Sequence, residues 1–452
     1  LQWHQATRFH RMNVNLEHAN TEIARLNKQL TSENLRLGAE IEVARQIQMM
    51  VLPTKDELGG IHELEIAAFM EPADEVGGDY YDVLQLDDKV KIGMVTTLST
   101  KAGYLGDDIR KGFELAIEQQ GGKLGGVPVD LIVEDDGRKP ESARQIATRM
   151  IEQDKVKLMT GIIFSNVAGA TVPDVVANDV IYISPNAAPS TLAGEGCNPN
   201  YFVVAWQNDA LHEAAGAAAK KLGYKNAFVL APNYQAGKDA IAGFKRTFGG
   251  EIAGELYTQL DQTDYSAEMA QIRAANPEVV FQFHPGGLGI AFMRQYQQAG
   301  LLGQIPMVLS EPSTDAVVLN AVGDAAVGVV ATAHWNRDFD NEANKEFVAA
   351  WEEKYGDRPI TYYASQGYDT GKLIASGLAK TGGVDDLDAL RAALKEADFA
   401  SVRGDFKFGA NQHPIHNWYI LDVVKDDSGV HTKTREVLLE NYGDSYAEQC
   451  KM

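Results

Sequence analysis

From Lys89 onward, short continuous apolar runs alternate with amphipathic segments that carry apolar residues every three or four positions. Such runs are typical of strands buried on both faces and covered by intervening helices. They fall in two tandem sets, one from KIGMVTTL to VIYIS and one from NAFVLAP to PMVLS. The sequence therefore predicts an α/β fold of two Rossmann-like lobes with parallel sheets.

Strand character returns near the end of the chain, in KFGANQHPIHNWYILDVV. We therefore expect the chain to cross between the lobes more than once, through a three-strand hinge. On this basis we expect lobe 1 to comprise residues 89–208 and 336–413, and lobe 2 to comprise residues 209–335 and 414–452.

The first 53 residues show a seven-residue apolar repeat instead. Glu33 and Glu40 interrupt its second row, and Pro53 ends the pattern. The sequence predicts a coiled-coil or signalling helix over 1–53, with a long helix packed on its own domain as the alternative. A short β segment, LEIAAFMEP and YYDVLQL, is expected within 54–88. The repeat consists of Leu16, Ile23, Leu30, Leu37, Ala44 and Val51, followed three residues later by Ala19, Leu26 and Ile47.

Composition narrows the range of functions. The 452 residues are 45% hydrophobic and 23% charged, with a formal charge of −22, so no broad basic face exists for nucleic acid. Only Cys197 and Cys450 are present, which excludes a zinc cluster and leaves two free thiols or one bridge. We expect no transmembrane helix and no secretory signal peptide, and a first residue other than Met suggests a fragment or a processed form.

Motifs for catalysis are missing. APNYQAGKDA has Pro232 and Asp239 where a phosphate loop needs Gly and Ser or Thr, and no Gly-x-Ser-x-Gly elbow surrounds Ser165. The ten His residues show no HExxH spacing. We therefore expect no enzyme and no cofactor in residues 89–452.

Polar and aromatic residues near the predicted strand ends favour a ligand cleft, because parallel sheets bind ligands there. Ser165 and Asn166 follow VKLMTGIIF, where they would either cap a helix or help to bind a carboxylate. SPNAAPS, with Asn186, offers small residues that let backbone approach a ligand. Glu311, His284 and Gln366 are weaker polar candidates. The aromatic candidates are Tyr104, Trp206, Tyr234, Phe283, Trp335, Tyr362 and Tyr363.

Residues from about Lys89 to Met452 resemble the type I periplasmic solute-binding proteins of ABC importers, the leucine/isoleucine/valine-binding family, and especially its aromatic-acid branch. The residues that carry the resemblance are KIGMVTTLSTKAGYLGDDIRKGFELA, TGIIFSNVAGATVPDVV, YISPNAAPST, FVLAPNYQAGKDAIAGFK and GDAAVGVVATAHW. It implies a periplasmic receptor that captures a small carboxylate, such as p-coumarate or a benzoate, and docks on a membrane permease. Branched-chain amino-acid binding is the alternative.

The resemblance also assigns roles by position. Tyr104 closes the cleft, Ser165 and Asn166 bind the carboxylate, and Asn186, Ala187, Ala188 and Asn208 lie around the ligand head. His284 and Glu311 fall where amino-acid binders hold the side chain and ammonium, but SPNAAPS lacks their Thr, which favours an aromatic acid. The resemblance further implies that Cys197 and Cys450 form a bridge.

Residues 1–88 resemble a truncated start of a PPM-type phosphatase of the stage II sporulation class, with its signalling helix. Asp79 in GGDYYD is the metal-binding position, but GMVTTLSTKAG lacks the next Asp, so we expect no metal site and at most residual phosphatase activity. The family is cytoplasmic in type, which suggests a fused chain. A ligand sensor that dimerises through this helix is the remaining alternative.

Overall fold

The computed structural model describes residues 2–51 and 89–452. By backbone contacts the chain divides into two units, Leu1–Asp88 and Lys89–Met452. The β segment predicted within 54–88 and the acidic frame around Asp79 lie outside the described residues.

The described residues of the first unit form the helix α1 (Gln2–Val51), so the predicted long helix is confirmed and begins earlier in the chain than its apolar repeat. The apolar repeat lies uncovered along it, with Leu16, Ile23 and Leu30 each more than half exposed. The coiled coil itself stays a prediction. Among the described residues, no helix combines the length and apolarity needed to cross a membrane.

The first lobe of the second unit is built on a six-stranded sheet in the order β2-β3-β1-β4-β5-β6. β1, β3, β4, β5 and β6 are parallel, and β2 adds an antiparallel edge. The strands are β1 (Val90–Thr96), β2 (Lys123–Leu124), β3 (Val127–Asp135), β4 (Leu158–Thr160), β5 (Ile181–Ser184) and β6 (Tyr201–Val203). The helices are α3 (Gly103–Glu118), α4 (Pro140–Glu152), α5 (Ser165–Ala177), α11 (Glu342–Tyr355), α12 (Tyr362–Thr381) and α13 (Leu387–Lys395).

The second lobe holds the remaining long strands. β7 pairs in parallel with β8 and β9, and β10 pairs in parallel with β11. Its strands are β7 (Asn226–Pro232), β8 (Glu251–Thr258), β9 (Val279–Gln282), β10 (Val308–Ser310), β11 (Val330–Ala333), β13 (Pro414–Asp426) and β14 (Gly429–Tyr442). Its helices are α6 (Asn208–Lys221), α7 (Gln235–Phe248), α8 (Ser266–Ala275), α9 (Gly287–Gln298) and α10 (Ala316–Val322).

The predicted parallel sheets are present in both lobes, and antiparallel strands join them near the C-terminal end of the chain. β13 runs antiparallel to β11, to β14 and to the short β12 (Lys407–Phe408). Only Asp427 and Ser428 connect β13 to β14, and a connection this short permits only an antiparallel hairpin. The sheets are therefore mixed.

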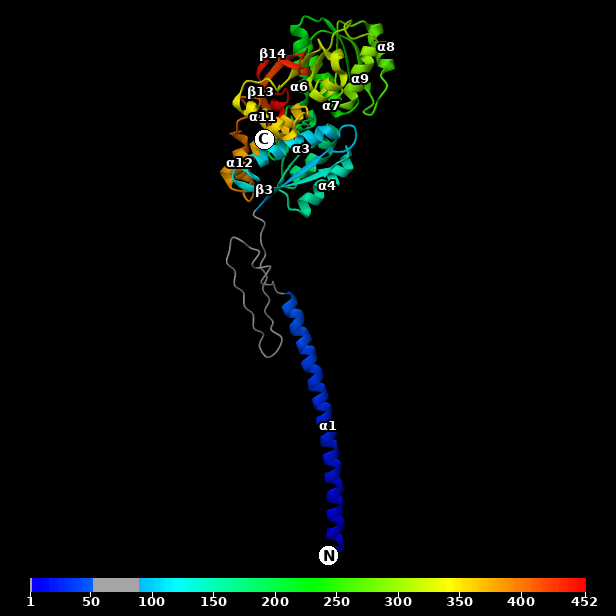
Figure 1. The fold of residues 1–452 in the computed structure, drawn as a ribbon, viewed down its shortest axis with the longest axis vertical. Coiled ribbons are helices and arrows are strands. Elements are labelled where there is room, and N and C mark those ends of the chain that lie inside the picture. The colour runs from blue at the N-terminus through cyan, green and yellow to red at the C-terminus, as the bar shows by residue number, and fades with distance from the viewer. Residues whose placement is uncertain (1, 52–88) are drawn as a thin grey trace. The chain divides into compact units, whose positions relative to one another are not determined.

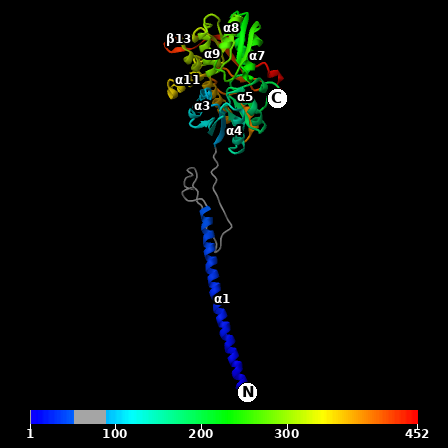
Figure 2. The ribbon, with the colours of Figure 1, turned by 90° about the vertical axis from the view of Figure 1, so that its right-hand side faces the viewer.

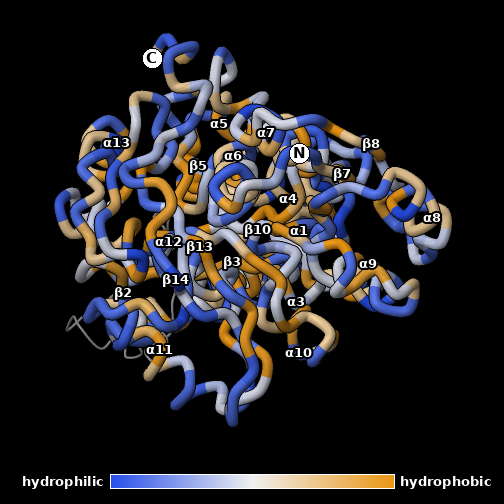
Figure 3. The backbone as a smooth tube through the Cα atoms, turned by 90° about the horizontal axis from the view of Figure 1, so that it is seen from above, coloured by the Kyte–Doolittle hydropathy of each residue, from blue (hydrophilic) through white to orange (hydrophobic). Residues whose placement is uncertain are grey.

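The two lobes are visible in Figure 1, where α3, α4 and α12 belong to one and α7, α8 and α9 to the other. The chain passes between them after β6, after β11 and again on entering β13. Figure 2 shows α4 and α5 close together on the first lobe, and these helices also pack on each other. In Figure 3 hydrophobic stretches gather around labelled strands such as β5 and β13, as expected for sheets covered by helices.

Close helix packing fixes the start of α12. A Cβ on Gly112 of α3 would lie 2.0 Å from the carbonyl oxygen of Ala364, and one on Gly367 would lie 2.0 Å from that of Ile109. Only glycine allows this approach of α3 and α12. The first residues of α12, Tyr362 and Tyr363, are thereby held rigidly at the edge of the lobe.

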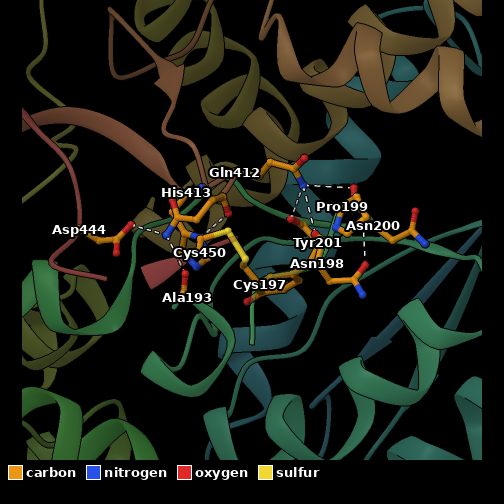
Figure 4. Close-up of a disulfide and its surroundings, with 11 residues drawn as sticks. Ala193, Cys197, Asn198, Pro199, Asn200, Tyr201, Gln412, His413, Asp444 and Cys450 are labelled. Carbon is orange, nitrogen blue, oxygen red and sulfur yellow. Dashed lines mark hydrogen bonds between the residues drawn. A yellow bond between two sulfur atoms is a disulfide. The ribbon is translucent and has the colours of Figure 1, made fainter. Parts of the chain in front are cut away.

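Cys197 and Cys450 form a disulfide, which confirms the bridge implied by resemblance (Figure 4). Their Cα atoms lie 5.7 Å apart although 253 positions separate them in sequence. The tail before Cys450 is also bound to α6, because Ser445 Oγ donates to Glu213 and Tyr446 Oη donates to Asp209. The C-terminus thus joins a loop of the first lobe to a helix of the second.

Candidate binding cleft

A cavity of about 30 Å³ lies where the two lobes face each other. The first lobe and the segment that follows β6 contribute nine residues. These are Leu105, Ile163, Phe164, Ser165, Asn186, Ala187, Trp206, Tyr362 and Tyr363. The second lobe contributes Asn208, Leu211, His212, Tyr234, Ala236, Phe283, Pro285 and Pro312. A space of this size holds one or two water molecules, so a larger ligand requires the lobes or side chains to move apart.

Ser165 is the first residue of α5, and the extended residue before it, Phe164, occupies the N-cap position. The alternative role of Ser165 as a helix cap is therefore wrong, because the helix start has no side-chain cap. Its Oγ instead accepts a hydrogen bond from Asn208 Nδ2 at 2.9 Å, which leaves the hydroxyl hydrogen free to donate. Together with the positive end of the helix dipole, this hydroxyl suits an anion.

Asn208 organises this end of the cleft. Its Nδ2 also donates to Asp239 Oδ2 at 3.0 Å, and its Oδ1 accepts from the backbone N–H of Ala188 at 3.1 Å. Asp239 accepts further bonds from the backbone N–H and hydroxyl of Ser190 in the opposite lobe. Ala188 therefore supports Asn208 and does not itself line the cavity.

Aromatic side chains form the walls. Tyr234 stacks on Phe283 with ring centroids 6.4 Å apart, and Trp206 packs on Tyr362 at 5.2 Å. Among the lining residues there is no Asp, Glu, Lys or Arg. The one histidine, His212, is buried, and burial lowers its pKa to about 3, so it is neutral. The cavity is an uncharged aromatic slot with hydrogen-bond donors at one end.

Tyr104 does not line the cavity but bridges the lobes beside it. Its hydroxyl donates to Asp315 Oδ2 at 2.8 Å, and a Cβ on Gly286 would meet that hydroxyl at 3.3 Å. Arg138 and Asp261 form a second bridge between the lobes. Two polar contacts outside the cavity lining thus hold the lobes together.

Asp315 makes stability depend on pH. Burial raises its pKa to about 7 from the ordinary 3.8, although hydrogen bonds from Tyr104, Val318 and Val317 lower it. The folded protein keeps a proton that the unfolded chain releases, so this stabilisation is full below pH 3.8 and is lost as pH rises through about 7. Between pH 4 and 8 we expect the free energy of unfolding of the wild type to fall by on the order of 2 kcal/mol through this group. Asp315→Asn, which cannot titrate at this position, should not show that fall.

Thermal denaturation midpoints of the two proteins across this pH range measure the difference. Asp209, whose pKa burial raises to about 6, titrates in both proteins and cancels in the comparison. Identical pH profiles would show that Asp315 is not protonated in the fold.

Three predicted ligand residues lie elsewhere. His284 is fully buried, with Nε2 bonded to Thr258 Oγ1 and Nδ1 bonded to Gln282 Oε1, so it does not line the cavity in this structure. It packs on Phe292 in the core because successive residues at a strand end face opposite sides.

Glu311 and Trp335 do not line the cavity either, and both line a second groove. Glu311 pairs with His334, and burial raises its pKa well above the ordinary value. Trp335 donates from Nε1 to Asn344 at 2.7 Å and packs on Phe347.

Asn166 and Gln366 do not line the cavity either, although both carry buried side-chain atoms without a partner. The residues that the sequence analysis missed follow directly from those it named. Ile163 and Phe164 precede Ser165, Pro285 and Pro312 follow His284 and Glu311, and Leu211 and His212 lie one helical turn beyond Asn208. Extending each predicted strand end by two residues and each helix by one turn would have found them.

No group of three His, Cys, Asp or Glu suitable for a metal ion occurs in residues 2–51 or 89–452. Among the residues that line the cavity, Ser165 carries a hydroxyl and His212 is the only imidazole, and no bond between them is present in this part of the chain.

Comparison with known proteins places these features in context. Residues 89–428 match the sequence family described as periplasmic binding protein. An ABC transporter solute-binding protein from R. palustris, solved with benzoate, is 31% identical with a TM-score of 0.76, and the match covers 80% of this chain and 100% of that one.

Two further relatives carry different descriptions. A solute-binding protein of an ABC transporter from Rhodopseudomonas palustris BisB5, solved with 3,4-dihydroxybenzoic acid, is 29% identical with a TM-score of 0.75, covering 79% of this chain and 99% of that one. The Leu/Ile/Val-binding protein homolog 6 of Brucella melitensis is 27% identical over 369 residues, which cover 79% of this chain and 93% of that protein.

Proposed function

This chain belongs to the periplasmic binding protein family, and from that we propose that it is the solute receptor of an ABC importer and captures a small aromatic carboxylate between its lobes. The family acts outside the cytoplasm, where a disulfide such as Cys197–Cys450 persists. The expected partners are the ligand and a membrane permease.

One observation carries the choice of ligand: no charged side chain lines the cavity. An α-amino acid carries an ammonium group whose burial needs a carboxylate or several acceptors. Glu311 and Asp315 lie outside the cavity and are already bonded to His334 and Tyr104. An aromatic carboxylate needs only donors for its anionic end and apolar walls for its ring, and Ser165, Trp206 and Phe283 provide both.

Closure depends on contacts that exist only when the lobes meet. Tyr104 donates to Asp315, and Ser190 Oγ donates to Asp239 Oδ1 at 2.7 Å, in each case from the first lobe to the second. A ligand that touches both walls favours the closed state by its differential affinity. We propose that the permease recognises this closed pair of lobes.

A ligand panel tests the proposal. At 100 times its Kd, a benzoate or hydroxybenzoate should raise the denaturation midpoint by about 5 °C, whereas leucine, isoleucine and valine should leave it unchanged. Calorimetric titration of the same compounds gives the affinities. Stabilisation by the amino acids alone would overturn the choice of ligand.

The exposed apolar repeat of α1 favours a second candidate, a receptor or sensor that dimerises through this helix. Sedimentation of the full chain should then give a dimer. Ile23→Glu together with Leu30→Glu should give a monomer, whereas Leu35→Glu should not, because Leu35 lies 72% exposed outside the repeat. A wild-type monomer at micromolar concentration would exclude this candidate.

We further propose that residues 1–88 derive from a phosphatase-type start without a working metal site. The support is sequence resemblance alone, around Asp79. If the purified chain hydrolyses a phosphate ester only with metal, and Asp79→Asn abolishes this activity, then the metal site works and the proposal is wrong.

A further inference from the structure

Asn186 presents an unusual group to the ligand cavity. It follows β5 in SPNAAPS, lines the cavity and is only 9% exposed. Its Nδ2 donates to the carbonyl oxygen of Ile163 at 2.9 Å. Because the amide nitrogen must face that carbonyl, the orientation of the side chain is fixed and Oδ1 faces the other way.

Oδ1 of Asn186 is buried and has no hydrogen-bond donor in residues 89–452. An amide oxygen is an acceptor only, so no rotation or proton transfer lets it pair with a ligand carboxylate. Leaving such an acceptor unpaired under a bound ligand is unfavourable, whereas a hydroxyl that donates to it restores the bond lost from water.

Resting on the function proposed above, we infer that Asn186 Oδ1 accepts a hydrogen bond from a ring hydroxyl, so that the solute is a hydroxylated aromatic carboxylate. Asn186 is bonded to the carbonyl oxygen of Ile163, two residues before Ser165, so the proposed hydroxyl site lies next to the start of α5 where the carboxylate binds. A site built to bond a hydroxyl discriminates strongly against an analogue that lacks it.

Other polar groups of the cavity serve this role less well. Both ends of the Asn208 amide are already bonded, to Ser165, Asp239 and Ala188. Tyr362 Oη is also buried without a partner, but a hydroxyl both donates and accepts and turns freely, so it selects no particular ligand group. Tyr362 therefore provides a matched control.

Calorimetric titration of the full-length protein with benzoate and the three monohydroxybenzoates tests the inference. At least one monohydroxybenzoate should bind about tenfold or more tightly than benzoate. In Asn186→Ala this ratio should fall to about one through loss of hydroxybenzoate affinity, with benzoate little changed. Tyr362→Phe should keep the wild-type ratio.

Several results would overturn the inference. Equal wild-type affinities for benzoate and every monohydroxybenzoate would do so even if Asn186→Ala failed to fold. If the preference for a hydroxybenzoate over benzoate survives in Asn186→Ala, or is lost only in Tyr362→Phe, then Asn186 is not the residue that selects the hydroxyl. If no aromatic acid binds at all, the proposed function fails and this inference fails with it, whereas binding of benzoate without selectivity refutes the inference alone.

Discussion

Ser165→Asp is expected to lose about 100-fold or more in affinity for an aromatic carboxylate while the ligand-free protein keeps its stability. The new carboxylate would lie within a few ångströms of the ligand carboxylate, where like charges repel by several kcal/mol even at an effective dielectric constant of about 20. The fold should tolerate the change, because an acidic residue in the first turn of α5 interacts favourably with the helix dipole. Asn208 Nδ2, which now donates to Ser165 Oγ, remains able to donate.

Calorimetry measures the affinity, and thermal denaturation without ligand measures the fold. Ser165→Ala is the matched control, since it removes the hydroxyl without adding charge and should cost about tenfold. If Ser165→Asp binds a benzoate or hydroxybenzoate as tightly as the wild type, the carboxylate does not lie at the start of α5.

The largest effect on stability is expected at the hinge, where Asp369→Ala should cost about 3 to 5 kcal/mol. Arg403 and Asp369 are both almost completely buried, and Arg403 Nε donates to Asp369 Oδ2 at 3.3 Å. Arg403 Nη1 also donates to the carbonyl oxygen of Ala205, in the segment where the chain first passes between the lobes. Removal of Asp369 leaves this buried cation without its partner.

Two causes of the lost stability are possible, the unpaired charge of Arg403 and the lost hydrogen bonds of Asp369. Urea unfolding of Asp369→Ala and of the double variant Asp369→Ala with Arg403→Met distinguishes them. The double variant should recover much of the lost free energy of unfolding, because replacing a buried ion pair by apolar groups of similar volume is often neutral. If both variants are equally destabilised, the loss comes from the bonds that Ser401 Oγ and the backbone N–H of Val402 donate to Asp369, and the charge is not the reason.

Much of the fold follows from sequence because buried parallel strands have a distinctive composition. KIGMVTTL, VIYIS and NAFVLAP all contain strands of the predicted lobes. The antiparallel hairpin of β13 and β14 is harder to foresee. Buried and half-buried residues alternate along most of β13, β14 has no fully buried residue, and the place of the hairpin beside β11 depends on contacts far apart in sequence.

The cleft was predictable at its ends and less so at its walls. Ser165 was named because it follows a predicted strand, Asn186 and Asn208 were named from the family resemblance, and all three line the cavity. The sequence places a strand end only to within a residue or two, and here Phe283 lines the cavity while its neighbour His284 does not. An aromatic residue packs equally well in a core, as Trp335 does against Phe347.

The interleaved order of the lobes also constrains how the chain acquires its structure. The first lobe needs α11, α12 and α13, which follow the body of the second lobe, and the second lobe needs β13 and β14, which come last. Neither lobe is complete until β13 and β14 have been made, and contacts between such distant segments make folding slow. The Cys197–Cys450 bridge, which joins residues 253 positions apart, can form only after this interleaved part of the chain has been made.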